Sequence, residues 1–272
     1  MRRRQSLCDR RYRDPLESSC AFYVWCRRGD LPVKETDARV IADHPLDRPV
    51  WSALTGRQSA FACRNSLALR FRPVVSPLAA AMDSSAVALA ALHDLAGEDE
   101  ELWQLEKDPG PIPAGMELVR EAACVQMTAH SVTAGRAVSG AVRLGENDAE
   151  DMLALATLTA PGPFRVGTYQ IGGFTGIRHE GRLVAMAGER TKPGEFTEVS
   201  GVCTHPDFRG RGYAGFLMRE VTSAILDRGE TPFLHCYATN QSAITLYESL
   251  GFRVFQQVMA RVIRRGTACS GA

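Results

Sequence analysis

Apolar and polar residues follow a regular pattern from residue 136 to residue 265. Alternating or short apolar runs predict β-strands over residues 138–144, 174–179, 182–189, 196–204, 233–237 and 252–263. Apolar positions three or four residues apart predict helices over 148–158 and 242–250, and a longer helix that carries Leu217, Val221 and Ile225 and ends at Gly229. The order β, α, β, β, β, α, β, α, β is typical of a mixed sheet with helices against it, so the predicted fold class is α/β of the mixed α+β kind.

Residues 44–130 show a weaker pattern of the same kind. The predicted elements are a strand over 67–71, a helix capped by Ser84 or Ser85 that ends near Ala96, and a strand over 116–127. The small polar segment 128–135 follows, and we place a domain boundary there. The sequence therefore predicts a small α+β N-terminal region over 44–130 and a second domain over 136–265.

Residues 1–43 have no sustained hydrophobic period, so we expect a poorly ordered Arg-rich extension. Residues 1–28 contain eight arginines against three acids, whereas the whole chain has a net charge of +1, so the rest of the chain is mildly acidic. A nucleic-acid-binding surface normally needs a basic face, so nucleic acid is not an expected partner. The three acids also disfavour a transit peptide.

Signals for a membrane span, for secretion and for a metal site are missing from the sequence. The longest stretch without Asp, Glu, Lys or Arg, Thr231–Tyr247, is shorter than the ~18 residues of a membrane-spanning helix and includes several polar residues. The eight cysteines form no CxxC pair and no cluster with His at metal-ligand spacing. No apolar segment of sufficient length follows the Arg-rich start. We therefore expect a cytoplasmic protein with reduced thiols and no bound metal.

The segment 205–214 combines glycines with arginines between a predicted strand and a predicted helix. Glycines let the backbone approach a ligand, and the first N–H groups of a helix have no partners within it, so such a helix start binds anions. Arg209 and Arg211 add positive charge that suits a phosphate. A solvated glycine turn is the plain alternative.

Gly210, Gly212 and Gly215 also satisfy the G-x-G-x-x-G spacing of a dinucleotide-binding loop. The context disfavours that interpretation for two reasons. The residues His205–Arg209 separate the strand from the first glycine, and the strand over 233–237 has no acidic end to hold a ribose.

The pattern Arg209-x-x-Gly212-x-Ala214 resembles the loop with which the GNAT superfamily of N-acetyltransferases holds the pyrophosphate of acetyl-CoA. The likeness continues upstream in 201–206 and downstream in 240–252, which resembles the last helix and strand of that family. This resemblance covers residues 138–263 and implies a mixed, mostly antiparallel sheet flanked by helices. Residues 44–130 resemble the segment that precedes this fold in one bacterial branch, and we interpret them as a degenerate copy of the same fold.

The resemblance also implies which residues bind acetyl-CoA as the co-substrate. The backbone N–H of Val202 is expected to face the thioester carbonyl, while Cys203 and Thr204 pair with the pantetheine arm as an added strand would. Asn240 either contacts the pantetheine or only caps its helix. The pyrophosphate is expected on the loop residues Arg209, Gly210, Arg211, Gly212, Tyr213 and Ala214.

Glu198 and Tyr247 are the predicted catalytic residues. Glu198 lies eleven residues before Arg209, where the histone-acetylating branch of the family carries its carboxylate, so the resemblance implies a general base. A solvent-facing Glu is the alternative, Glu189 is the substitute, and a bulge at Gly201 would change which face these side chains share. Tyr247 matches the general acid that passes a proton to the CoA sulfur, and a Tyr that only packs is the alternative.

These features predict an acetyl-CoA-dependent N-acetyltransferase that acetylates a primary amine by direct attack in a ternary complex, without a covalent acyl-enzyme. A non-catalytic acyl-CoA-binding sensor or scaffold is the alternative, and it would tolerate the loss of Glu198 and Tyr247. The amine acceptor is not readable from the sequence, and we expect its specificity to reside in the loop over 161–173 and in the first half of the chain. The oligomeric state is left open, a homodimer included.

Overall fold

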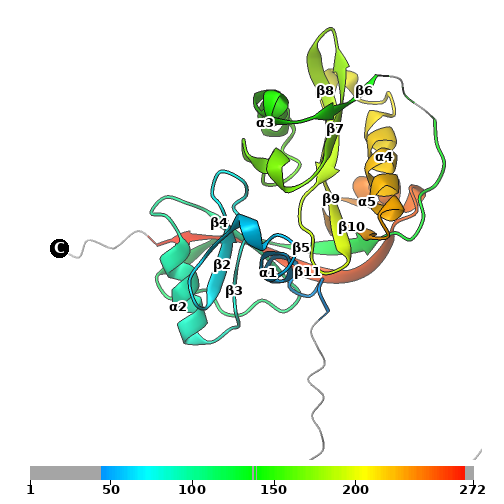
Figure 1. Cartoon of the computed structure of the whole chain (residues 1–272). Helices are drawn as coiled ribbons and strands as arrows, with labels where there is room; N and C mark the ends of the chain where they lie inside the picture. Colours follow the sequence, from blue (N-terminus) through cyan, green and yellow to red (C-terminus); the bar gives the residue numbers. More distant parts are fainter. Residues whose placement is uncertain (1–43, 137, 139, 267–272) are drawn as a thin grey trace, which may run out of the picture. The chain divides into compact units, whose positions relative to one another are not determined.

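The computed structural model of the chain describes residues 44–136, 138 and 140–266, and the predicted extension over 1–43 lies outside them. Eight strands form one sheet in the order β4-β11-β5-β10-β9-β8-β7-β6 (Figure 1). Their bounds are β4 Leu102–Glu106, β5 Met116–Thr128, β6 Ala141–Leu144, β7 Phe174–His179, β8 Arg182–Glu189, β9 Phe196–Thr204, β10 Thr231–Tyr237 and β11 Arg253–Arg265. Neighbouring strands are antiparallel except β9 and β10, which are parallel, so the predicted mixed, mostly antiparallel sheet is confirmed.

The hairpin of β7 and β8 matches its prediction residue for residue. Glu180 and Gly181 form its turn with φ of 50° and 82°, the left-handed values that a two-residue hairpin loop requires. On the other side of β8, the pairing with β9 shifts register between Met186 and Gly188, and Gly201 lies opposite this shift with φ of 63°. Gly201 therefore marks a β-bulge in β9.

The first elements of the described chain build a second, three-stranded sheet. They are α1 Pro49–Thr55, the 3₁₀ turn η1 Ser59–Phe61, the strands β1 Ala62–Arg64, β2 Ala68–Phe71 and β3 Ala79–Ala81, and α2 Ala86–Leu95. Ser85 caps α2, because its Oγ accepts a hydrogen bond from the Ala88 N–H at 3.2 Å. The helix and the strand predicted over 84–96 and 67–71 are thus present, whereas α1, β1, β3 and β4 have no counterpart in the sequence prediction.

The predicted boundary at 128–135 does not separate two sheets. Strand β5 comes from the N-terminal region, yet it pairs with β10 on one edge and with β11 on the other. Its residue Met127 lies opposite both Leu234 and Val254 and is fully buried. A strand in the middle of a sheet needs both neighbours for its backbone hydrogen bonds, so residues 44–130 complete the same core. The interpretation of this region as a degenerate copy of the fold stays a prediction.

Helices cover both faces of β7, β8 and β9 (Figure 1). The remaining helical segments are η2 Glu146–Asp148, α3 Ala149–Thr159, η3 Thr168–Ile171, η4 Pro206–Phe208, α4 Tyr213–Asp227 and α5 Gln241–Ser249. On one face α4 buries Leu217, Val221 and Ile225, and each such side chain stabilises the fold by roughly 1.5–3 kcal/mol. On the other face α3 buries Met152 and Leu155. Within the described ranges, no helix combines the length and the apolar composition that crossing a membrane requires.

Strands β9 and β10 separate along their length. Their parallel pairing joins only 196–198 to 231–233, and the last pair is Glu198 with Phe233. Beyond that pair β9 continues against β8, whereas β10 continues against β5. The sheet therefore opens between the two strands, and the end of β9 leads directly to the loop before α4.

Candidate active site

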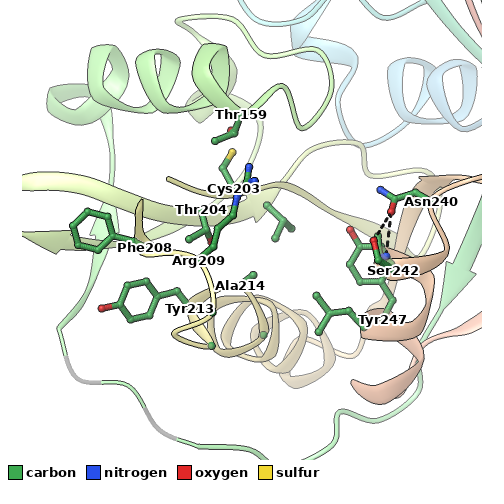
Figure 2. Close-up of a pocket in the computed structure, with 16 residues that line it drawn as sticks. Thr159, Cys203, Thr204, Phe208, Arg209, Tyr213, Ala214, Asn240, Ser242 and Tyr247 are labelled. Carbon is green, nitrogen blue, oxygen red and sulfur yellow. Dashed lines mark hydrogen bonds between the residues drawn. The ribbon is translucent and has the colours of Figure 1, made fainter. Parts of the chain in front are cut away.

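A cleft of about 670 Å³ lies at the opening between β9 and β10. Its walls come from the end of β9 (202–204), the loop and first turn of α4 (208–215), and the first turns of α5 (240–247), with Thr159 added from α3. Figure 2 shows the stretch with Cys203, Thr204 and Arg209 on one side, and Asn240 with Tyr247 on the other. Every predicted co-substrate residue borders this cleft except Arg211.

The loop before α4 presents a row of backbone donors. Gly210 and Gly212 have φ of 75° and 80°, and a Cβ built on either would meet no atom within 4 Å. The N–H groups of residues 210–215 find no backbone or side-chain acceptor within the described part of the chain, and the first helical bond runs from the Phe216 N–H to the Gly212 carbonyl. Since α4 has 15 residues, its N-terminal dipole adds to these donors. The loop therefore has the geometry of an anion site.

Arg211 does not contribute to the cleft wall. Its guanidinium lies over the Phe208 ring, 4.7 Å from the ring centroid. This cation–π contact holds the guanidinium of Arg211 against the Phe208 ring. The Arg211 side chain therefore does not line the cleft, whereas Arg209 borders it, and the predicted contact of Arg211 with the pyrophosphate stays a prediction.

The end of β9 supplies a buried thiol and an unpaired hydroxyl. Burial raises the pKa of Cys203 to about 12, so its thiol stays protonated and is a poor nucleophile. Its Sγ donates to the Gly201 carbonyl at 3.2 Å. The Thr204 Oγ1 is buried and has no hydrogen-bond partner among the residues described.

Tyr247 lies at the far end of the cleft. Its ring packs edge-on against Phe252 with centroids 6.5 Å apart, and burial raises the pKa of its phenol to about 12. No hydrogen bond joins its hydroxyl to another described side chain or carbonyl. Asn240 caps α5 through Oδ1, which accepts from the Ala243 N–H at 3.2 Å. Tyr247 thus combines a packing role with a free hydroxyl. Asn240 caps α5 and also borders the cleft, and its contact with the pantetheine stays a prediction.

A second cavity of about 110 Å³ shares Asn240 and Tyr247 with the cleft. Its remaining lining comes from β5 and nearby strands, from the loop after α3, and from the residues just before β3 and just after β8, namely Leu78, Trp103, Leu105, Cys124, Pro161, Gly162, Pro163, Arg190, His235, Cys236, Tyr237 and Ala260. Neither cavity is bordered by an Asp or Glu of the described chain. Tyr247 therefore stands between two spaces that differ in size and in chemistry.

Glu198 lies inside the protein and not in either cavity. Only 1% of it is exposed, and its oxygens accept hydrogen bonds from Arg190 Nε and Nη2 at 3.0 and 2.6 Å and from Thr191 Oγ1 at 2.7 Å. His235 Nδ1 lies 2.7 Å from Oε1. Burial would raise the pKa of Glu198, but the charge of Arg190 and the hydrogen bonds from His235 and Arg190 outweigh it and hold that pKa well below its usual range.

This geometry does not favour Glu198 as the general base, and that role stays an untested prediction. A carboxylate whose oxygens are all engaged and whose pKa is depressed does not take a proton from an amine readily. Glu189 does not replace it, because Glu189 is buried in contacts with Lys192 at 2.7 Å and Arg228 at 2.8 Å and borders neither cavity. The sequence placed Glu198 on the correct strand but carried no sign of its partners.

Sequence reasoning missed the residues that line the second cavity. Arg190, His235 and Trp103 come from three separate segments, and each looks like an ordinary strand or loop residue in the sequence. His235 is also engaged on both ring nitrogens, since Nε2 lies 3.0 Å from Gln126 Nε2. The loop over 161–173, where specificity was expected, does contribute Pro161–Pro163.

Comparisons with known proteins agree with this fold. The family model described as FR47-like protein matches residues 174–262, which span β7 to β11. N-alpha-acetyltransferase RimI of Mycobacterium tuberculosis is 36% identical over 84 residues, which is 29% of this chain and 51% of that relative. The match thus spans about half the length of this curated relative.

Solved structures extend the likeness to most of the chain. A putative acetyltransferase of the GNAT family from Novosphingobium aromaticivorans is 45% identical, with 83% of this chain and 100% of that chain covered and a TM-score of 0.77. A GCN5-related N-acetyltransferase from Kribbella flavida shares the fold at 18% identity, with 80% and 95% covered and a TM-score of 0.58. The chain belongs to the GNAT family of N-acetyltransferases.

Proposed function

We propose that this protein uses acetyl-CoA to acetylate a primary amine by direct attack on the thioester in a ternary complex. The observation that carries the proposal is the row of free N–H groups at 210–215, placed where β9 and β10 part. A diphosphate matches such a row in charge and in hydrogen-bond capacity. Among the described residues, this is the place where a row of free N–H groups lies beside the opening between β9 and β10.

Acetyl-CoA would lie along the cleft from the loop to Tyr247. The pyrophosphate would bind the N–H groups of 210–215 beside Arg209, and the pantetheine arm would extend along Val202–Thr204 as an added strand. The thioester would then reach the end of the cleft that Tyr247 borders.

The chemistry would centre on the Tyr247 hydroxyl. The amine nitrogen attacks the thioester carbonyl, a C–N bond forms, and the C–S bond breaks as the tetrahedral intermediate collapses. The proton that leaves the nitrogen passes to the Tyr247 Oη while the phenol hands its own proton to the departing sulfur, so the phenol ends neutral. With its pKa raised to about 12, Tyr247 remains protonated and able to donate at ordinary pH.

The amine would have to arrive without its extra proton. Since no described Asp or Glu borders either cavity and both nitrogens of His235 are engaged, the cavities offer no free base to an ammonium ion. Water or buffer would remove that proton before the amine enters. This differs from the role that Glu198 was predicted to have.

The release of free thiol from acetyl-CoA in the presence of primary amines tests the proposal. We expect continuous thiol release that depends on the amine, together with a product heavier than the amine by one acetyl group in mass spectrometry. Acetyl-CoA binding without thiol release for any amine would instead identify an acyl-CoA sensor or scaffold. Absence of both binding and release would refute the proposal altogether.

A further inference from the structure

The guanidinium of Arg190 reaches the wall of the second cavity with one nitrogen unused. Arg190 is only 8% exposed, and its Nε and Nη2 both donate to Glu198. Its Nη1 has no hydrogen-bond acceptor among the described residues. That nitrogen lies beside the loop after α3. It is 3.8 Å from the position that a Cβ on Gly162 would occupy. Both Arg190 and Gly162 line the cavity.

An unused donor in such a place points to a ligand. The nitrogen is not sealed inside the fold but opens to the cavity, so its N–H groups can donate to an oxygen of whatever occupies the cavity. The salt bridge with Glu198 uses only Nε and Nη2, so it does not account for the position of Nη1 on the cavity wall. Glu198 also balances the charge of Arg190, so the remaining donor suits an oxygen of either a neutral carbonyl or a carboxylate.

The rest of the cavity is mostly apolar and small. Leu78, Trp103, Leu105 and Ala260 line it together with Pro161 and Pro163. Its volume of about 110 Å³ suits a small branched aliphatic group, and the rest of the acceptor can extend past Tyr247 toward the cleft. At the other end, Tyr247 and Asn240 connect it to the cleft.

We propose that the second cavity binds the acceptor as a small aliphatic amine that carries a carbonyl or carboxylate oxygen, with that oxygen on Arg190 Nη1. This inference rests on the proposed function, since Tyr247 would stand between the thioester in the cleft and the amine in the cavity. Arg190 is then a substrate-binding residue, and Glu198 is a positioning residue that fixes its guanidinium.

Three matched amines test the inference on the unmodified protein. Valinamide carries a carbonyl, valine carries a carboxylate, and 3-methyl-2-butylamine has the same branched body without an oxygen. Their kcat/KM values are measured across pH and expressed for the neutral amine, because the three amines differ in basicity. We expect at least one oxygen-bearing amine to exceed 3-methyl-2-butylamine by roughly 10-fold to 100-fold, the effect of one hydrogen bond to a charged group.

The variant Arg190→Lys tests whether Arg190 causes the preference for the oxygen-bearing amine. It keeps a positive charge beside Glu198 but removes the donor that faces Gly162, so the preference for the oxygen-bearing amine should fall to about 1. A second variant, Ala260→Leu, fills the cavity from β11 and should raise KM for all three amines without changing the affinity for acetyl-CoA. If Arg190→Lys does not fold, the preference of the unmodified protein still decides the question.

The outcomes separate support for the inference from its failure and from the failure of the proposed function. A preference for valinamide supports a neutral carbonyl, and a preference for valine supports a carboxylate. Equal values for all three amines, or turnover of neither oxygen-bearing amine while acetyl-CoA binds, overturn the inference and leave the proposed function standing. Loss of acetyl-CoA binding itself would be a failure of the proposed function and is measured separately by calorimetry.

Discussion

Arg190 and Glu198 are joined twice, once through their side chains and once through their backbones. The guanidinium donates two hydrogen bonds to the carboxylate, and the Arg190 N–H donates to the Glu198 carbonyl at 3.0 Å. Glu198 also belongs to the last residue pair between β9 and β10. The ion pair therefore lies at the point where the sheet opens, and it is positioned to hold the geometry of the opening.

Replacement of Glu198 by Gln should lower stability and leave the pH profile of the reaction unchanged. The substitution leaves the buried charge of Arg190 without its partner, so we expect a loss of about 3–5 kcal/mol in the free energy of unfolding, measured with urea. Glu195→Gln is the control, since Glu195 is exposed and lies three residues earlier in the same segment. A lost low-pH limb in the rate profile of Glu198→Gln would restore Glu198 as a base.

Acid should destabilise the fold through Glu230 as well as Glu198. Burial alone would raise the pKa of Glu230, but hydrogen bonds from Arg228 and Thr197 and the charges of Arg228 and Arg57 lower it to about 2. A carboxylate with a lowered pKa stabilises the fold above its unfolded pKa of about 4.5 and loses that effect as the pH falls. The free energy of unfolding should therefore drop from pH 4.5 to pH 2, less steeply in Glu230→Gln. An identical slope in both proteins would contradict the ion-pair account.

Removal of the Tyr247 hydroxyl should slow turnover without weakening acetyl-CoA binding. For Tyr247→Phe we expect kcat to fall roughly 100-fold, since a positioned proton donor contributes about 10²–10⁴-fold. Tyr169→Phe is the matched control, because Tyr169 is partly buried but borders neither cavity. In the unmodified protein, the raised pKa of about 12 means that activity does not decline at high pH until well above pH 10. An unaltered kcat in Tyr247→Phe would reduce Tyr247 to packing.

The fall of kcat/KM at low pH should reflect protonation of the amine substrate and not of a group on the protein. Because neither cavity holds a described carboxylate, only the neutral amine reacts, and kcat/KM rises with pH up to the solution pKa of that amine. Propylamine and 2-methoxyethylamine differ in basicity, so their limbs should be displaced by the difference in their pKa values. Coincident limbs for the two amines would indicate a titrating group on the protein.

The sequence predicted most of the catalytic half of the fold because its signals there are local. Alternation, a two-residue turn at Glu180–Gly181 and helix caps defined β7, β8 and β9 to the residue. The N-terminal half was harder, since β3 is a run of three alanines whose strand conformation depends on its pairing with β2. The pairing of β5 on both edges with strands more than 100 residues away could not be predicted, because nothing local near the expected boundary at 128–135 indicates it.

The candidate site shows the same division between local and distant information. The loop over 209–214 was readable because its glycines and the helix start are adjacent in the sequence. Glu198 was assigned by position along a strand, and that position does not reveal that Arg190 and His235 close around it. Arg211 was assigned by charge, but its contact with Phe208 depends on the turn of the loop.

Calorimetric titration of acetyl-CoA into three proteins tests the central claim most directly. Gly212→Glu places a carboxylate in the open space over the loop, whereas Gly229→Glu places the same residue at the other end of α4, with a similar φ of 74° and equally open surroundings. Both variants incur a similar backbone strain of about 1–2 kcal/mol. We predict that the unmodified protein and Gly229→Glu bind acetyl-CoA alike and that Gly212→Glu binds at least 100-fold more weakly. Equal binding by all three proteins would contradict the account.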